Sequence, residues 1–402
     1  MHLRPFRVQR TGALLAVLVM TWPVVRGQVP PVPVPAAESA VMGHAAPWGR
    51  IEVRPVYLEV PDALLASRPK PNSVPRWCFP NGTEASVREL FTRAGLPAAM
   101  QDRILNPAKR LIQQDTLILF PSPADQSAMT TGMRNIIYPE LAKSLQNEFH
   151  YTPIYIQGGN LDEWLEHSGL NPALQLMVRQ RVWQRDGNLV FSDVRALVEA
   201  AHSVDDVWSI FRAITRTRTL LIDLVLTPDL NTESVVDYWT AGDPAADTVP
   251  LLRAAIAGGG VSRLDVSRLL PPIPRRRLYT YPTLDLAAQG RMPDCHWSSL
   301  NFFSSSPQNY YLDSELVGAR ISDDYDFVKP PYRYGDLICY YRTPTITVHS
   351  CIYIADDIVY TKNGENILAP WVFMPLEDVS AMYLYHSGWF IQGYRLKPGS
   401  RR

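Results

Sequence analysis

The last third of the chain contains several short runs of apolar and β-branched residues, separated by polar turn residues. Segments rich in Ile, Val, Tyr and Thr are bounded there by turn residues, as strands usually are. Five such segments predict strands, at 337–342, 345–354, 358–361, 383–385 and 390–394. Ala355-Asp356-Asp357 predicts a hairpin turn between the second and third of them. This region is therefore expected to form an antiparallel sheet.

Between residues 80 and 270 the apolar positions recur instead every three to four residues, as on one face of a helix. Thr83 and Ser203 stand before two such runs as N-caps, and Asn160 with Glu163 matches a capping box. We expect residues 80–270 to form an all-helical domain. No metal, phosphate or dinucleotide motif occurs in it, so the sequence assigns this domain no role.

Residues 1–27 are typical of an export signal. Three arginines precede an apolar run over 12–25, and small residues stand before Gln28, where cleavage is expected. The alternative is an uncleaved, tilted N-terminal anchor, although the run is short for a membrane span. Either interpretation predicts an exported protein of the periplasm or cell envelope, with no membrane contact except through an uncleaved signal.

Two proline-rich stretches divide the rest of the chain. Residues 28–79 are expected to be a spacer with a short extended segment at 51–59. Residues 271–277, Pro-Pro-Ile-Pro-Arg-Arg-Arg, are expected to be a linker before the strand-rich region 278–402. The predicted fold class is α+β, with a helical domain followed by a helix packed on an antiparallel sheet.

Composition excludes several classes of function. The 402 residues carry 39 basic and 39 acidic side chains, so the net charge of zero gives no reason to expect a nucleic-acid partner. Four cysteines without a Cys-x-x-Cys pair predict neither a disulfide scaffold nor a zinc site, and no cofactor is expected. Cys339 and Cys351 could pair across a hairpin, but we expect both to be free, buried thiols.

One arrangement of residues points to chemistry. Asp294-Cys295 opens an apolar-rich segment that could be a helix, and His349 follows on a predicted strand. A thiol and an imidazole are the minimum of a cysteine nucleophile with its base. A helix start and a nearby imidazolium both favour the thiolate, and helix N–H groups can bind a developing oxyanion.

The order and spacing of Asp294-Cys295, Gly335-Asp336 and His349-x-x-Ile-Tyr-Ile resemble the NlpC/P60 family of papain-like cell-wall cysteine peptidases, over roughly residues 278–385. The resemblance implies a papain-like domain over 278–402, with Cys295 as nucleophile and His349 as base. Gly335-Asp336 would have a structural role. The implied function is an exported cysteine peptidase or amidase that hydrolyses amide bonds in peptidoglycan stem peptides, with peptidoglycan or a peptide as its partner.

The family orients its histidine with a polar residue on the following strand, and that position falls near Thr361. We predict Asn363 as the orienting residue, because its amide can accept the imidazole N–H, and Thr361 as the second candidate. His296 is a rival base, but a residue adjacent to the nucleophile generally points away from it. Alternation places Cys351 on the same face as His349.

Two other functions stay open. The papain-like domain could be catalytically idle and serve as a binding or scaffold module of the envelope. Alternatively, the same Cys–His pair could act as a thiol acyltransferase. The bulky Trp297 beside the nucleophile, where the family has small residues, narrows the expected pocket.

Overall fold

The computed structural model describes residues 41–42, 46–66, 75–227, 229–243, 245–258, 262–384 and 388–400. The expected export signal over 1–27 and the start of the expected spacer lie outside these residues. Within the described ranges, no helix has the length and apolar character needed to cross a bilayer. Residues 39–402 cluster as one compact unit.

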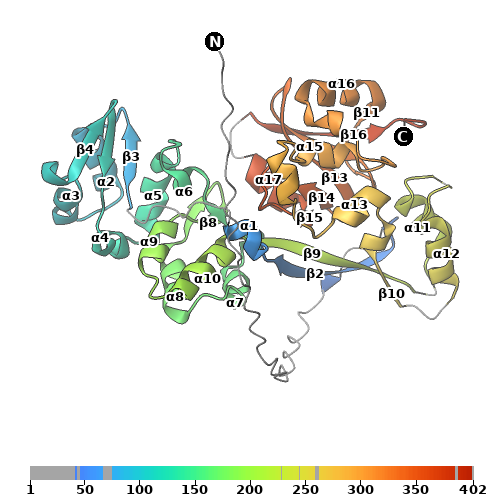
Figure 1. Ribbon diagram of the computed structural model, residues 1–402, viewed down its shortest axis with the longest axis horizontal. Helices are drawn as coiled ribbons and strands as arrows, with labels where there is room; N and C mark the ends of the chain where they lie inside the picture. The colour runs from blue at the N-terminus through green and yellow to red at the C-terminus, as the bar shows by residue number, and fades with distance from the viewer. Residues whose placement is uncertain are drawn as a thin grey trace, which may run out of the picture. The chain divides into compact units, whose positions relative to one another are not determined.

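A four-stranded antiparallel sheet contains the first long strand of the chain. Its order is β1 (Val41–Met42), β2 (Arg50–Leu58), β9 (Thr217–Val225) and β10 (Arg263–Asp265). Strand β2 confirms the extended segment expected at 51–59. Strands β2 and β9 run side by side along their whole length, as Figure 1 also shows.

The expectation of an all-helical region over 80–270 is wrong. Besides β9 and β10 it contributes to two small antiparallel sheets, β3-β5-β4 and β6-β8-β7. Their strands are β3 (Trp77–Pro80), β4 (Arg110–Gln113), β5 (Thr116–Leu119), β6 (Ile154–Tyr155), β7 (Trp183–Arg185) and β8 (Asn188–Phe191). Strands of two to four residues are too short to show an alternating pattern. The Asp186-Gly187 turn between β7 and β8, with φ of 51° and 83°, is nevertheless a recognisable hairpin signal.

The helices that precede residue 262 are mostly short, and a side chain caps many of them. They are α1 (Asp62–Ala66), α2 (Glu84–Arg93), α3 (Ala98–Ile104), η1 (Pro107–Lys109), α4 (Pro123–Ala128), α5 (Thr131–Leu141), α6 (Glu148–Tyr151), η2 (Gln157–Gly159), α7 (Leu161–Glu166), α8 (Pro172–Arg181), α9 (Val194–Glu199), α10 (Val204–Thr215), α11 (Thr232–Trp239) and α12 (Val249–Ala257). Thr83, Asn160 and Ser203 cap α2, α7 and α10 as predicted. Glu163, expected to complete a capping box, instead pairs with Arg218 at 2.7 Å.

The strand-rich region forms a six-stranded antiparallel sheet in the order β11-β16-β12-β13-β14-β15. The strands are β11 (Tyr325–Val328), β12 (Leu337–Thr343), β13 (Ile346–Ala355), β14 (Ile358–Lys362), β15 (Trp371–Pro375) and β16 (Phe390–Leu396). They confirm the strands predicted at 337–342, 345–354, 358–361 and 390–394. The strand predicted at 383–385 is wrong, because Tyr383 ends a helix, and Tyr385 lies outside the described residues.

Helices cover both faces of this sheet. The remaining ones are η3 (Val266–Leu269), α13 (Pro272–Arg277), α14 (Leu284–Ala288), α15 (Cys295–Leu300), η4 (Asn309–Leu312), α16 (Ser314–Asp324) and α17 (Leu376–Tyr383). Residues of α15 pack with Ile352 and Tyr360 in one apolar cluster, whereas Val379 of α17 packs with Cys351 and Val359 in another. The fold is thus mixed α+β with antiparallel sheets (Figure 1).

Residues 271–277 were expected to be a linker, and this expectation is wrong, because residues 272–277 form helix α13. Proline fits the first turn of a helix, where its missing N–H is not needed. The segment 271–277 also does not separate two domains, because β9, which precedes it, contacts the C-terminal sheet. Thr219 Oγ1 donates to the Phe373 carbonyl at 2.9 Å and accepts from the Phe373 N–H at 3.1 Å. Residues on both sides of 271–277 therefore share one core.

Candidate active site

Cys295 is the first residue of α15, as predicted. The side chain of Asp294 caps this helix by accepting the Trp297 N–H at 2.7 Å. The cap satisfies one free N–H group of the first turn and places a carboxylate beside the thiol. Cys295 is only 4% exposed, so a substrate cannot reach the sulfur without movement of the residues around it.

Polar contacts hold α15 against β13. His296 Nδ1 lies 2.9 Å from Ser350 Oγ, and this hydroxyl donates to Ser299 Oγ at 3.2 Å. Burial lowers the pKa of His296, while the Asp294 carboxylate acts in the opposite direction. The Nδ1 of the rival base His296 is thus already engaged by Ser350.

His349 lies in the middle of β13 and is completely buried. Its Nε2 is 2.9 Å from Thr361 Oγ1, and its ring stacks on Tyr383 of α17 with the centroids 4.0 Å apart and the planes 7° from parallel. Its Nδ1 is also buried and has no hydrogen-bond partner. The imidazole is therefore held firmly, with one nitrogen left unused.

The partner of His349 is Thr361 and not Asn363, which corrects our first choice. Strand β14 ends at Lys362, so Asn363 has already left the ladder that keeps Thr361 beside the imidazole. The Asn363 amide nitrogen faces the Met382 sulfur at 3.8 Å, and its Oδ1 is buried without a partner.

The structure does not join the expected nucleophile to its expected base. Alternation along β13 puts His349 on the sheet face that packs against α17, whereas Ser350 faces α15. Because the Nδ1 of His349 has no partner, no hydrogen bond reaches it from Cys295.

A buried lysine lies on the α15 side of β14 and was not found from the sequence. Lys362 is 0% exposed, and its Nζ donates to the carbonyls of Gly364 and Asn366 at 2.6 and 3.1 Å. Burial lowers the pKa of Lys362 to about 8, against the opposing influence of Cys295 and Asp294. The available signal was a single lysine at the end of a strand of otherwise apolar and uncharged residues.

The other predicted features of this region lie as follows. Cys339 and Cys351 are free and buried, and burial together with neighbouring thiols raises the pKa of each. Cys351 shares the His349 face, as alternation predicted. Asp336 forms a two-pronged pair with Arg395, at 2.7 Å for each bond. Gly335 has φ of 87°, and a side chain there would collide with the Phe303 ring. Both residues of the Gly335-Asp336 dipeptide therefore have a structural reason for their identity.

In the described part of the chain, no three His, Cys, Asp or Glu side chains converge as a metal site. Comparisons of the whole chain with protein-family models, with curated proteins and with solved structures gave no match. The geometry and chemistry of the site therefore carry the functional argument.

Proposed function

We propose that residues 278–402 form a papain-like cysteine hydrolase domain in which Cys295 attacks an amide carbonyl and His349 is the base. The observation that carries the proposal is the unused Nδ1 of His349. Leaving a polar atom buried without a partner costs about 1–3 kcal/mol, so such an atom calls for an explanation, and a catalytic role is one. With the proton on Nε2 and donated to Thr361, Nδ1 presents the lone pair of a general base.

The reaction follows from these groups. Nδ1 takes the thiol proton, and the thiolate adds to the amide carbonyl. The tetrahedral intermediate collapses to a thioester as the imidazolium returns its proton to the leaving amine. Nδ1 then deprotonates a water that attacks the thioester, which releases a carboxylic acid and the free thiol. Lys362, whose pKa responds to the Cys295 thiol, adds positive charge on the side where the thiolate forms.

This proposal makes the described structure a closed form. Cys295 and His349 are both buried; α15, which carries Cys295, lies on the Ser350 face of the sheet, and the His349 ring lies on the Tyr383 face. Turnover requires α15 or β13 to rearrange so that the sulfur and Nδ1 come to the same side of the sheet. This rearrangement is larger than the lengthening of catalytic hydrogen bonds that is common in enzymes without substrate. The substrate class, amides of peptidoglycan stem peptides, is supported by the resemblance alone.

A second candidate is a catalytically idle papain-like domain that binds a partner in the envelope. The separation of Cys295 from His349 favours it, because an idle descendant has no need to keep thiol and imidazole in contact. The ring stack on Tyr383 would then serve packing only.

The deciding experiment is digestion of purified muropeptides followed by mass spectrometry of the products. Hydrolysis should be lost in Cys295→Ser and in His349→Ala, and retained in Cys78→Ser, which changes another buried thiol far along the chain. If Cys295→Ser digests as fast as the parent, the assignment is wrong. A transfer product formed with an added amine would identify an acyltransferase, and no product with any substrate would favour the binding module.

A further inference from the structure

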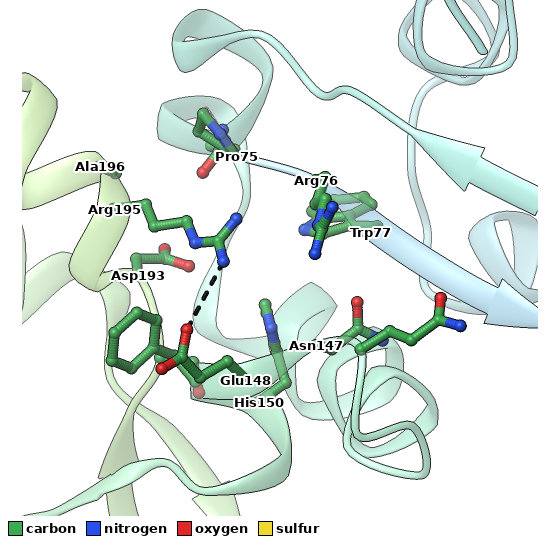
Figure 2. Close-up of a pocket in the computed structure, with 13 residues that line it drawn as sticks. Pro75, Arg76, Trp77, Asn147, Glu148, His150, Asp193, Arg195 and Ala196 are labelled. Carbon is green, nitrogen blue, oxygen red and sulfur yellow. Dashed lines mark ion pairs between the residues drawn. The ribbon is translucent and has the colours of Figure 1, made fainter. Parts of the chain in front are cut away.

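A small cavity lies far from Cys295 in the sequence, where the segment before β3 meets α6 and α9 (Figure 2). Its volume is about 30 Å³. That is enough for one or two water-sized atoms, whereas a drug-sized molecule needs several hundred Å³. Its lining includes Arg76, Asn147, Glu148, His150, Asp193 and Arg195.

Positive charge exceeds negative charge around this cavity. Arg76 and Arg195 both line it, and each lowers the pKa of the nearby Cys78 thiol against the larger effect of burial. The two guanidinium groups are also close enough for Arg76 to lower the pKa of Arg195. Like charges that approach one another in a partly buried place are costly unless an anion separates them.

The two carboxylates nearby do not remove this excess. Asp193 is buried and lies 3.4 and 3.6 Å from two further arginines, Arg134 and Arg181, which are also buried. The ion pair between Glu148 and Arg195 is long, at 3.6 Å, and the Glu148 side chain is 60% exposed. Four guanidinium groups are thus balanced by only two carboxylates, and one of these, on Glu148, is free to rotate into solvent.

His150 supplies a separate sign of an occupant. It is 8% exposed, and its Nε2 is buried with no hydrogen-bond partner. Figure 2 shows its ring pointing toward the space between Arg76 and Arg195. Arg195 enters this space from α9 with a side chain that is 16% exposed, and Arg76 lies exposed at the mouth.

We propose that this cavity binds one small oxyanion, a carboxylate or phosphate group, held between Arg76 and Arg195 and contacted by His150. The planar fork of a guanidinium matches two oxygens of either group. The volume admits the oxygens and leaves the rest of the ligand in solvent. The bound anion would take the place of the Glu148 carboxylate on Arg195. This site is independent of the reaction proposed for Cys295.

Isothermal titration of the purified protein with sodium phosphate, and separately with sodium acetate, tests the proposal at an ionic strength fixed with sodium chloride. We expect one site per chain, with Arg76→Gln weakening affinity about tenfold, the value of one charge-assisted contact. Glu148→Gln should tighten binding, because it removes the competing carboxylate. Arg88 has an exposed side chain on α2 and lies outside the cavity lining, so Arg88→Gln is the matched control and should bind like the parent.

The affinities of the parent and the variants for the two anions decide whether the site exists and which anion it prefers. Tighter phosphate than acetate binding identifies a tetrahedral ligand, and the reverse identifies a planar carboxylate; both support the site. Binding that is unaffected by Arg76→Gln and Glu148→Gln, or no binding in the millimolar range, overturns it. Imidazole NMR adds a readout that does not depend on stability: the His150 signals, assigned with His150→Gln, should shift on adding the anion in the parent protein and in Arg88→Gln.

Discussion

The imidazole of His349 is bonded to Thr361 through Nε2 and has nothing at Nδ1. A single threonine hydroxyl contacts this ring, in place of the Asn363 amide that the sequence favoured. The stacked Tyr383 ring explains why a single hydroxyl is enough: it fixes the plane of the imidazole, and Thr361 needs only to fix its rotation within that plane.

Replacing Thr361 with valine should therefore act on both stability and activity. The change leaves Nε2 buried without a partner, at a cost of about 1–3 kcal/mol in the free energy of unfolding. Muropeptide turnover should fall about tenfold or more, because the imidazole loses its orientation. Denaturant unfolding and product formation measure the two effects, and Thr361→Ser should recover most of both. A valine variant as stable and active as the parent would remove Thr361 from the site.

Asp336 should be a strong determinant of folding without being catalytic. Its carboxylate is 1% exposed and is held by Arg395 and by the Arg333 N–H. Asp336→Ala leaves a partly buried guanidinium unpaired, and losses of about 3 kcal/mol are usual for broken buried pairs. The matched control is Asp102→Ala, which breaks an exposed pair and should cost less than about 1 kcal/mol. Equal unfolding midpoints for the two variants would contradict the structural role of Gly335-Asp336.

Lys362 should destabilise the protein at neutral pH. Its pKa is about 8 in the folded protein and 10.5 in the unfolded chain, so the unfolded state binds more protons between these values. The penalty is complete below pH 8 and is relieved as pH rises toward 10.5. It amounts to about 3 kcal/mol, at 1.36 kcal/mol for each pKa unit.

We therefore expect Lys362→Met to raise the free energy of unfolding at pH 7, with the gain over the parent shrinking from pH 8 upward. The quantity to compare is the free energy of unfolding of Lys362→Met minus that of the parent at each pH. The buried thiols and tyrosines titrate in the same pH range and lower the stability of both proteins as pH rises, so their contribution cancels in this difference. Lys143→Met, at an exposed lysine, serves as control and should change little at any pH. A gain independent of pH would mean that methionine improves packing alone.

The thiols of Cys339 and Cys351 should resist alkylation in the folded protein. Burial raises both pKa values, so neither forms much thiolate near pH 8. In the unfolded chain both ionise at their ordinary pKa, so these groups stabilise the fold below about pH 8.5 and lose that contribution as pH rises further. Mass mapping after iodoacetamide treatment should show both peptides unmodified natively and modified in guanidinium. Rapid native modification of Cys351 would show that the His349 face opens to solvent.

The sequence predicted those parts of the fold that have long, regular patterns. The runs of Ile, Val, Tyr and Thr between Leu337 and Thr361 predicted three adjacent strands, and the caps at Thr83 and Ser203 are confirmed. Short hairpins such as the one at Asp186-Gly187 were missed, because three or four residues show no period. Tyr383 was predicted to lie on a strand, because aromatic residues favour strands. In the structure it ends α17, and its ring stacks on the His349 imidazole.

For the candidate site, the types of residue were predictable and their positions were not. The sequence shows a cysteine at a helix start, and the structure has the helix beginning there. Which face His349 occupies depends on how α15 and α17 share the sheet, and that is a property of the whole core. The burial of Lys362 was not predictable either, because its amine lies over the ring of Trp371, on a strand that no pattern predicted.

The Thr219–Phe373 bridge has a practical consequence for work on this protein. A chain cut at residues 271–277 would strip β9 from β15 and expose the apolar surface that the two strands now cover. Such a fragment should precipitate or require refolding aids, even though its sequence resembles a portable module. Limited proteolysis at the Arg275-Arg276-Arg277 cluster should accordingly give two pieces that stay together until a denaturant is added.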